Sequence, residues 1–410
     1  MNQPALTIAP QSAAAIAADG TWQTAVQPVI GVTVSNSIDE VEAVWRQLTV
    51  SSIESPGLTV DFIRAWVKDR GIASADQRYV VGRVDGEAVA LLPLHRKRVY
   101  GLPILTWFPG ANVGCYAPVA NCERLAALGV DGRRALWDAM TRELTGADLV
   151  YLRSIPVDVA GHAGLFDELG TTLEVETLHR SQYASWEECD RLQRNKSRRK
   201  HDRQQGDRLN AMGNVEFEAI GNDAATGAVI DTMFLQRSAR FKAMGVGDPF
   251  VGDRLIGFYQ DLAKPNSGVN VRLHVLRLNG DIVAVRYNIV HADRMFCLIS
   301  SMSDDPKIQN GSPGKQCLLR VMQTVFDEGA RVFDMGSGFT DEKRHWCNVQ
   351  MPLRQHYVGL NHRGAVVVAM HRTFQQLRAR IKSNTQLKSA ARWVMQISGR
   401  LKPVAANKSE

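Results

Sequence analysis

The sequence lacks the short motifs of several large enzyme classes. Its 410 residues contain no G-x-x-x-x-G-K-[ST] loop, G-x-G-x-x-G turn, G-x-S-x-G elbow or H-E-x-x-H pair. These absences argue against P-loop hydrolysis, dinucleotide binding, α/β-hydrolase chemistry and zinc-protease chemistry. No C-x-x-C pair occurs among the six cysteines, so we predict no metal site and expect reduced thiols. The cysteines are Cys115, Cys122, Cys189, Cys297, Cys317 and Cys347.

Long apolar runs are also missing. No stretch reaches the ~18 uncharged apolar residues that span a bilayer, and the first twenty residues lack the early cations and apolar core of a signal peptide. We therefore expect a cytoplasmic location. Residues 1–28 are rich in Ala, Gln and Pro without a sustained period, and we interpret them as a flexible leader.

The composition is that of a folded chain with room for two or three domains. Hydrophobic residues make up 45% and charged residues 22%, with a net charge of +7 and a pI near 9.1. A basic protein favours anionic partners, which could be nucleic acid, an anionic membrane surface or a phosphate-bearing small molecule. From residue 31 onward, β-branched runs alternate with amphipathic stretches, which predicts a mixed α/β fold.

Two segments of the chain are similar to each other. Residues 79–94 and 273–288 are each two β-rich runs joined by a tight-turn dipeptide, Asp85-Gly86 and Asn279-Gly280. After each hairpin we predict more strand, a helix (133–144 and 314–326) and a last strand (149–152 and 332–335). The sequence therefore predicts two copies of one α/β unit.

The sharpest local signal is a glycine-rich turn that opens a helix. Glycines allow a close backbone approach, proline suits the first helical turn, and free amides at a helix N-terminus attract anions. Lys315 adds a full positive charge. We predict a phosphate or pyrophosphate site here, formed by Gly311, Ser312, Pro313, Gly314, Lys315 and Gln316.

A second candidate group follows the last predicted strand. Asp334 ends this strand, where a carboxylate can point into a cleft, and Gly336 and Gly338 permit a sharp backbone path beside it. Lys343 lies nine residues on. This combination suits the binding of a polar substrate and proton removal from a nucleophile. Glu342 and His345 are further acid/base candidates.

A basic segment separates the two units. Residues 191–213 are predicted to form one long helix, followed by a strand and by helices near 223–242 and 252–262. Aromatic residues do not interleave its cations, so nucleic acid is not the expected partner. Arg237 is a candidate substrate contact. Residues 373–401 are predicted to form a basic C-terminal helix.

In their order and spacing these motifs resemble those of the CelD/BcsL-type proteins of the GCN5-related N-acetyltransferase (GNAT) superfamily, named for cellulose and exopolysaccharide biosynthesis. The resemblance covers about residues 31–357. Its elements are the basic helix ending at Met212-Gly213, residues 237–250, the Asn279-Gly280 hairpin, Ser312-Pro313-Gly314, and Asp334 to Gly338 with Lys343. Glu342 stands where family members often carry an aromatic residue.

The resemblance implies tandem GNAT-like domains, each a mixed sheet flanked by helices, with acetyl-CoA or another acyl-CoA as donor. The thioester would lie beside the strand that contains Ser300, and the pyrophosphate on the turn at 311–316. At the equivalent turn of the first copy Asp131 would repel a phosphate. We expect a leader (1–28), an N-terminal GNAT-like domain without donor binding (29–185), an acyl-CoA-binding domain (186–370) and a basic segment (371–410).

The expected reaction is direct attack of an amine or hydroxyl on the thioester. Asp334 would orient or deprotonate the acceptor, and Lys343, with Arg237, Gly336 and Gly338 nearby, would hold it. The acceptor would be a small molecule or saccharide. Two alternatives stay open: a FemAB-like transferase that uses charged tRNA, and a non-catalytic accessory protein that contacts the inner membrane or a polysaccharide synthesis complex.

Overall fold

The computed structural model describes residues 28–50, 53–109, 113–223 and 225–383; the predicted leader and residues 384–410 lie outside them. The first half begins with a strand and two helices and ends with a long strand. Its elements are β1 (Ile30–Ser35), α1 (Ile38–Leu48), α2 (Val60–Arg70), β2 (Gln77–Val84), β3 (Glu87–Val99), β4 (Leu102–Trp107), β5 (Val119–Ala120), α3 (Cys122–Ala127), α4 (Gly129–Arg142), β6 (Leu149–Pro156), β7 (Asp158–Val159), β8 (His162–Ala163) and β9 (Thr171–Gln182).

The second half repeats a similar succession of elements. They are α5 (Trp186–Gln193), α6 (Lys196–Asn210), β10 (Val215–Ile220), α7 (Thr226–Ala243), α8 (Pro249–Gly252), α9 (Ile256–Leu262), β11 (Val271–Leu278), β12 (Asp281–His291), β13 (Arg294–Met302), α10 (Pro313–Asp327), β14 (Val332–Ser337), α11 (Asp341–Trp346), β15 (Val349–Gly359) and α12 (His362–Ser383). In the described part of the chain, no helix is both long and apolar enough to cross a membrane.

Three helix predictions need correction. The single helix expected over 191–213 is two helices, because Asn195 caps α6 by accepting a hydrogen bond from the Arg198 N–H (2.9 Å). The helix expected over 252–262 is likewise divided between α8 and α9. The C-terminal helix begins at His362 rather than at Thr373.

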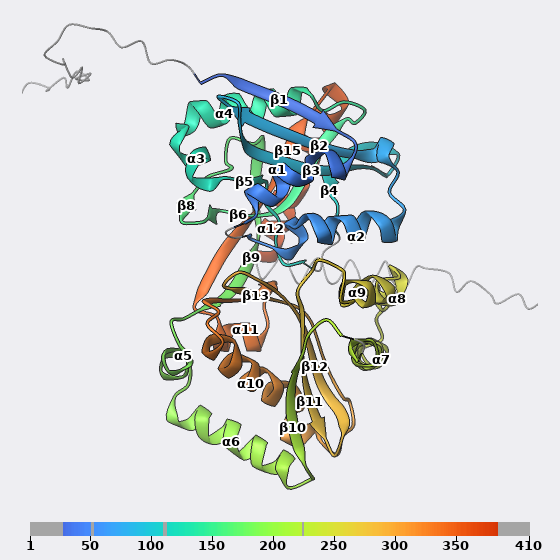
Figure 1. Ribbon diagram of the computed structural model, residues 1–410, viewed down its shortest axis with the longest axis vertical. Helices are drawn as coiled ribbons and strands as arrows, with labels where there is room; N and C mark the ends of the chain where they lie inside the picture. Colours follow the sequence, from blue (N-terminus) through green and yellow to red (C-terminus); the bar gives the residue numbers. More distant parts are fainter. Residues whose placement is uncertain (1–27, 51–52, 110–112, 224, 384–410) are drawn as a thin grey trace, which may run out of the picture.

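The predicted mixed α/β fold is confirmed. Thirteen of the described strands form one mixed sheet whose order is β1-β2-β3-β4-β6-β15-β9-β14-β13-β12-β11-β10, with β5 beside β3. Helices flank the sheet in both halves, and Figure 1 shows the first half above the second with β9 and β15 between them.

The predicted internal repeat is visible in backbone detail. Both hairpins turn on a non-glycine residue followed by a glycine, each with positive φ: Asp85 (52°) with Gly86 (84°), and Asn279 (53°) with Gly280 (88°). A register shift also precedes each turn at the equivalent place, at Gly82/Arg83 and at Leu276/Arg277. The β2-β3-β4-α4-β6 succession therefore corresponds to β11-β12-β13-α10-β14.

The two halves exchange their last strands. β15, at the end of the second half, pairs with β6 on one side and β9 on the other. β9, at the end of the first half, pairs with β14. Because each half is completed by a strand of the other, the halves cannot separate without breaking continuous sheet pairing. The domain boundary predicted at 185/186 stays a prediction, and three strand pairs cross it: β6–β15, β9–β15 and β9–β14.

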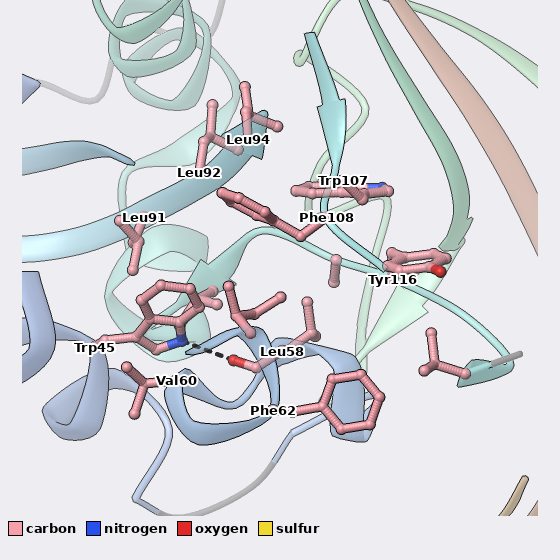
Figure 2. Packing of buried hydrophobic residues seen from close by; sticks show 14 of the residues in the cluster. Trp45, Leu58, Val60, Phe62, Leu91, Leu92, Leu94, Trp107, Phe108 and Tyr116 are labelled. Atoms are coloured by element: carbon pink, nitrogen blue, oxygen red, sulfur yellow. Dashed lines mark hydrogen bonds between the residues drawn. The ribbon is translucent and has the colours of Figure 1, made fainter. Parts of the chain in front are cut away.

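The main core also runs through both halves. Near α1 it contains Trp45, whose indole N–H donates to the Leu58 carbonyl (2.7 Å), and Figure 2 shows this pair with the surrounding apolar side chains. On the other side of α2, Phe62 and Trp66 pack edge-on against Phe258 of α9. Aromatic packing of this kind therefore fixes α2 against the second half.

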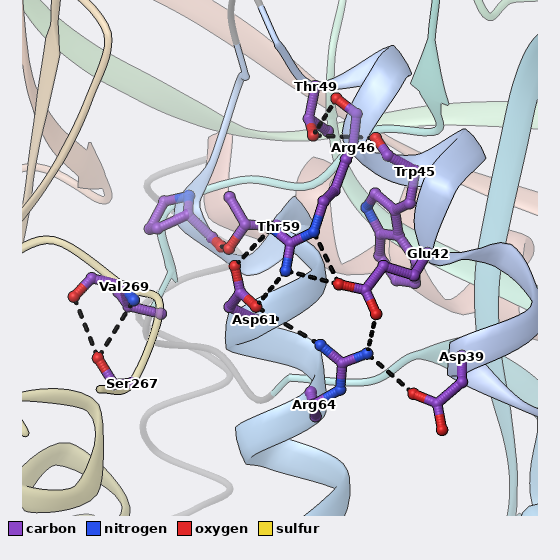
Figure 3. Close-up of polar contacts among 11 residues, drawn as sticks. Asp39, Glu42, Trp45, Arg46, Thr49, Thr59, Asp61, Arg64, Ser267 and Val269 are labelled. Atoms are coloured by element: carbon purple, nitrogen blue, oxygen red, sulfur yellow. Dashed lines mark hydrogen bonds and ion pairs between the residues drawn. The ribbon is translucent and has the colours of Figure 1, made fainter.

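Ion pairs join α1 to α2 on the surface. Arg46 contacts Glu42 and Asp61, and Arg64 contacts Asp39, Glu42 and Asp61 (Figure 3). The loop at Gly268 of the second half approaches the same place, since a Cβ there would lie 2.6 Å from Asp61 Cγ.

The strand exchange predicts a stability effect at Gly170. This residue has φ +74°, and a Cβ there would lie 2.3 Å from the Tyr357 carbonyl oxygen of β15. We expect Gly170→Ala to lower the free energy of unfolding by about 3 kcal/mol in urea titrations. Gly161→Ala is the matched control, since its φ is +83° with no atom near the added methyl, and should cost about 1 kcal/mol. Equal losses would contradict the close β9–β15 approach.

Candidate functional site

The opening between β13 and β14 organises the candidate site. These parallel strands pair only at Arg294↔Val332, Met295↔Phe333 and Phe296↔Asp334. Beyond this point β13 continues to Met302 without β14, while β14 stays paired with β9 across a register shift between Asp334 and Ser337. Residues 297–302 thus have no described strand on their β14 side, so the backbone groups that point to this side are not used in strand pairing.

The glycine-rich turn lies at the wide end of this opening, where the two strands are apart. Ser312 adopts a left-handed conformation (φ 48°) directly before Pro313, the first residue of α10. Its carbonyl accepts the Gln316 N–H (3.0 Å). The N–H groups of Gly314 and Lys315 have no acceptor among the described residues, as expected for the first turn of a helix. Two adjacent amides, a helix dipole and Lys315 together favour an anion.

Helix α6 holds this turn from behind. The Gln205 amide donates to Ser312 Oγ (2.7 Å), and the buried Gln316 amide donates to the Asp202 carbonyl (2.8 Å). The Ser312 hydroxyl therefore does not cap α10 itself. A Cβ at Gly311 would lie 3.0 Å from Leu209 Cβ. The basic helix thus has a structural task that sequence reasoning missed, and the Asp202 contact could not have been found because it uses a backbone carbonyl.

A cavity of about 500 Å³ lies in front of the turn. The end of β13, the start of α10, the start of α11 and one side of α7 enclose it. Four cationic side chains line it against two carboxylates: Arg237, Arg240, Arg286 and Lys315 face Asp341 and Glu342. Of the predicted site residues, the structure brings Arg237, Ser300, Ser312, Gly314 and Lys315 to this cavity.

Arg286 and Glu342 form an ion pair in the cavity wall. The buried Arg286 donates to both Glu342 oxygens (3.0 and 3.1 Å) and to the Gly314 carbonyl (3.4 Å). Burial alone would lower the pKa of Arg286, but the Glu342 charge outweighs it and raises this pKa. Sequence reasoning missed Arg286. A lone cation inside the apolar strand VAVRYNIV was the signal.

Arg237 faces the unpaired part of β13. Its guanidinium donates to the Ser300 carbonyl (3.1 Å) and lies over the rings of Phe241 and Phe250. Burial, followed by the nearby charge of Arg240, lowers the pKa of Arg237. No carboxylate among the described residues forms an ion pair with it, so its charge is available to an anionic group in the cavity.

Asp334 does not point into the cavity, and this expectation was wrong. Its side chain is buried, Oδ2 accepts from Arg180 Nε (2.7 Å), and Oδ1 accepts from the Gly336 N–H (2.8 Å). Arg180 also contacts Glu54 (2.7 Å), which in turn contacts Arg294 (3.0 Å). The carboxylate is therefore engaged in a buried ionic cluster of Glu54, Arg180, Arg294 and Asp334.

The charges of this cluster stabilise one another. Burial opposes the ionised form of Glu54, but Arg180 and Arg294 outweigh it and hold the pKa of Glu54 below its usual range. Arg180 has its pKa raised by Asp334 and Glu54 in spite of its burial. The cluster joins β9, β13, β14 and the segment before α2, so it fixes the strands that bound the opening.

The other predicted residues lie beside the cavity. Lys343 Nζ donates to the Gly336 carbonyl (3.2 Å), and burial lowers its pKa. Gly336 faces Gly114 of the first half, and Gly338 has open space around it. Gly311, Pro313 and Gln316 are buried beneath the turn. No group of three or more metal-ligating side chains occurs in the residues that the structure describes.

Part of the chain matches a known family of domains. Residues 196–344 match the family model of the acetyltransferase (GNAT) domain. This part of the second half thus matches a GNAT acetyltransferase domain. The match supports the GNAT superfamily, whereas the CelD/BcsL type stays a prediction. No curated protein matches the chain.

Solved structures share the fold at low identity. FemX is 11% identical with a TM-score of 0.52, and the match covers 79% of this chain and 96% of FemX. The C-terminal domain (DUF2156) of a putative lysylphosphatidylglycerol synthetase from Agrobacterium fabrum is 13% identical with a TM-score of 0.49, covering 82% and 96%. At these identities the likeness concerns the fold alone.

The buried cluster predicts a structural effect of Asp334. We expect Asp334→Asn to lower the free energy of unfolding by about 3 kcal/mol, because Arg180 loses one of its two buried partners. Asp341→Asn is the matched control, since Asp341 is 80% exposed and pairs only with exposed Arg344; it should cost less than about 0.5 kcal/mol. Chemical denaturation measures both. Similar losses for the two variants would contradict the cluster.

Proposed function

We propose that the protein is an acyltransferase that moves an acetyl or other acyl group from acyl-CoA to an amine or hydroxyl. The observation that carries the proposal is the pair of free amides at Gly314 and Lys315, at the mouth of the opening between β13 and β14. A donor in which a diphosphate is followed by an extended chain needs both features. The amides would bind the phosphates, and the opening would accommodate the chain.

The turn suits a diphosphate. A Cβ at Gly314 would lie 2.9 Å from Met302 Sδ, so glycine lets the helix start lie against the end of β13. The two amides would bind phosphate oxygens, and the Lys315 ammonium would neutralise their charge. The acyl part would then follow residues 297–302 past Ser300, where unpaired backbone N–H groups would polarise the thioester carbonyl.

An indole bridges the equivalent place in the first half. β4 and β6 pair only at Ile104↔Leu149 and Leu105↔Val150 before they part. There the buried Trp107 indole donates to the Arg153 carbonyl (3.1 Å) and stacks on Tyr116, as Figure 2 shows for the two rings. In addition α4 follows α3 without an open turn, and its first turn carries Asp131. These features support a first half without donor binding.

The chemistry we propose is direct attack of the acceptor amine or hydroxyl on the thioester carbon. The new bond to the acyl carbon replaces its C–S bond, and coenzyme A leaves as a thiolate that is protonated as it departs. Holding both reactants within about 3.5 Å supplies much of the rate advantage. Glu342, whose carboxylate Arg286 holds in the cavity wall, would take the acceptor proton, and Arg237 would bind an anionic group. Asp334 and Lys343 would be positioning residues that hold the end of β14. A sugar or exopolysaccharide precursor as acceptor rests on the CelD/BcsL resemblance.

The donor site is tested by charge reversal at the turn. We expect Lys315→Glu to weaken coenzyme A binding by about tenfold or more, measured by calorimetry, because a carboxylate would face the phosphates. Lys307→Glu makes the same change at an exposed lysine outside the cavity, and should alter the dissociation constant by less than about twofold. A wild-type protein that binds no coenzyme A, or equal effects of both variants, would remove the donor proposal.

The role of Glu342 is tested by separating turnover from binding. With acetyl-CoA and glucosamine as acceptor probe, we expect Glu342→Gln to lower kcat by about 10²-fold, with coenzyme A affinity nearly unchanged. Asp304→Asn, an exposed carboxylate outside the cavity, should leave kcat unchanged. A parallel loss of affinity and kcat in Glu342→Gln would indicate a structural role instead.

A FemAB-like transferase that uses charged tRNA is the second candidate. The likeness of fold to FemX favours it, as do the solvent-facing cations of α6. Lys196, Lys200, Arg203 and Arg208 form no ion pair within the described part of the chain, whereas Arg194 and Arg199 pair with Asp190. Binding of charged tRNA with no affinity for coenzyme A would favour this candidate.

A further inference from the structure

The positive charge of the chain is concentrated at its C-terminal end. Residues 362–410 contain ten Lys and Arg and a single acidic residue, Glu410. This segment therefore carries +9, while the net charge of the whole chain is +7. The preceding 361 residues carry −2. The net positive charge of the chain thus comes from residues 362–410, since the cations of α6 and of the cavity are balanced by acidic residues elsewhere in residues 1–361.

One side of α12 packs firmly on the sheet. Val368 is buried in a cluster with Ile104, Leu149 and Tyr357, and the Tyr357 hydroxyl lies 2.9 Å from His371 Nδ1. Arg372 donates to the Thr172 carbonyl of β9 (3.4 Å). These contacts orient α12, so its opposite face has a defined direction.

The opposite face of α12 is apolar and exposed. Val366, Met370 and Phe374 recur every four residues, and they are 59%, 67% and 59% exposed. Ala365, Ala369 and Thr373 are exposed on the same side. Three large apolar side chains in a row on a helix mark a surface that is covered when the protein is at work.

A basic and aromatic hairpin lies beside the start of α12. Its turn between β3 and β4 carries Tyr100, which is fully exposed, next to the sequence Arg96-Lys97-Arg98. Leu102 of this hairpin packs against the same cluster as Val368. Asp148 links the two elements, since its N–H donates to the Pro103 carbonyl and its carbonyl accepts the Leu360 N–H (both 2.9 Å).

We propose that this surface, formed by Val366, Met370, Phe374 and the β3–β4 hairpin and here named the lipid-docking face, binds a bilayer that contains anionic lipids. The apolar stripe would enter the interface, Tyr100 would lie at the headgroup level beside the exposed Arg98, and the net positive charge of the C-terminal sequence would favour anionic lipids. A second copy of the chain is a poorer occupant, because two segments of +9 would repel each other. A nucleic acid would use the cations but not the apolar stripe.

The test measures vesicle binding of the full chain by flotation. We expect binding to vesicles of phosphatidylcholine with phosphatidylglycerol, and at least about tenfold weaker binding to phosphatidylcholine alone. The double variant Met370→Gln/Phe374→Gln keeps good helix formers and every charge, and should weaken binding about tenfold or more because it removes the apolar insertion. Leu235→Gln is the matched control, since Leu235 is 71% exposed on α7, and should bind like the wild type.

Several outcomes would overturn the proposal. One is that the wild type ignores anionic vesicles. Another is binding that the double variant leaves unchanged while a matched polyanion such as heparin competes for it, which would indicate a charge effect alone. A third is a dimer in analytical ultracentrifugation that the double variant converts to a monomer without any lipid binding. Thermal melting of each variant confirms that the fold is kept, and donor binding tests the cavity separately.

Discussion

The parting of β13 from β14 is the feature on which the rest of the site depends. Two adjacent parallel strands normally continue to pair along their shared length, because unpaired backbone groups are costly when buried. Here the pairing stops after Phe296 and Asp334, and the start of α10 lies at the far, open end of the gap. The result is a slot with the unpaired edge of β13 along one side and two free amides at its mouth. A cavity with a cationic lining lies in front of it.

The strand exchange explains how such a gap is tolerated. β14 does not need β13 along its whole length, because β9 pairs with it from the other side, and β9 is itself held by β15. The buried cluster of Glu54, Arg180, Arg294 and Asp334 fixes the same strands through side chains. The first half therefore completes the sheet around the slot of the second half. Its own equivalent gap is bridged by Trp107, which donates to the Arg153 carbonyl.

Local signals predicted much of this structure. The Asp85-Gly86 and Asn279-Gly280 turns, the helix that begins at Pro313 and the glycines beneath it are set by the conformational limits of the residues themselves. These limits act within a few positions, so a single sequence shows them. The same local limits predicted the turn at Gly314 and Lys315, which the structure places at the cavity.

The parts that were missed depend on residues far apart in the chain. Glu54, Arg180 and Asp334 meet only because β9 lies between β14 and β15, and nothing near Asp334 in the sequence shows that Arg180 will occupy its carboxylate. The same holds for Arg286 on β12, whose place in the cavity wall depends on its contact with Glu342, a residue that the sequence had already indicated as an acid/base candidate. The break between α5 and α6 is set by a local feature, the N-cap at Asn195. It was missed because the continuous run of basic residues around it is typical of a single helix.

The central claim, that the turn at Gly314 and Lys315 binds the phosphates of the donor, is tested most directly at the two amides themselves. Protein labelled with ¹⁵N-glycine and ¹⁵N-lysine allows both N–H signals to be followed by NMR during titration with coenzyme A. The account predicts that Gly314 and Lys315 show the largest shifts of their residue types, while distant Gly161 and Lys264 stay in place. Saturation with coenzyme A that leaves both amides unshifted would contradict it.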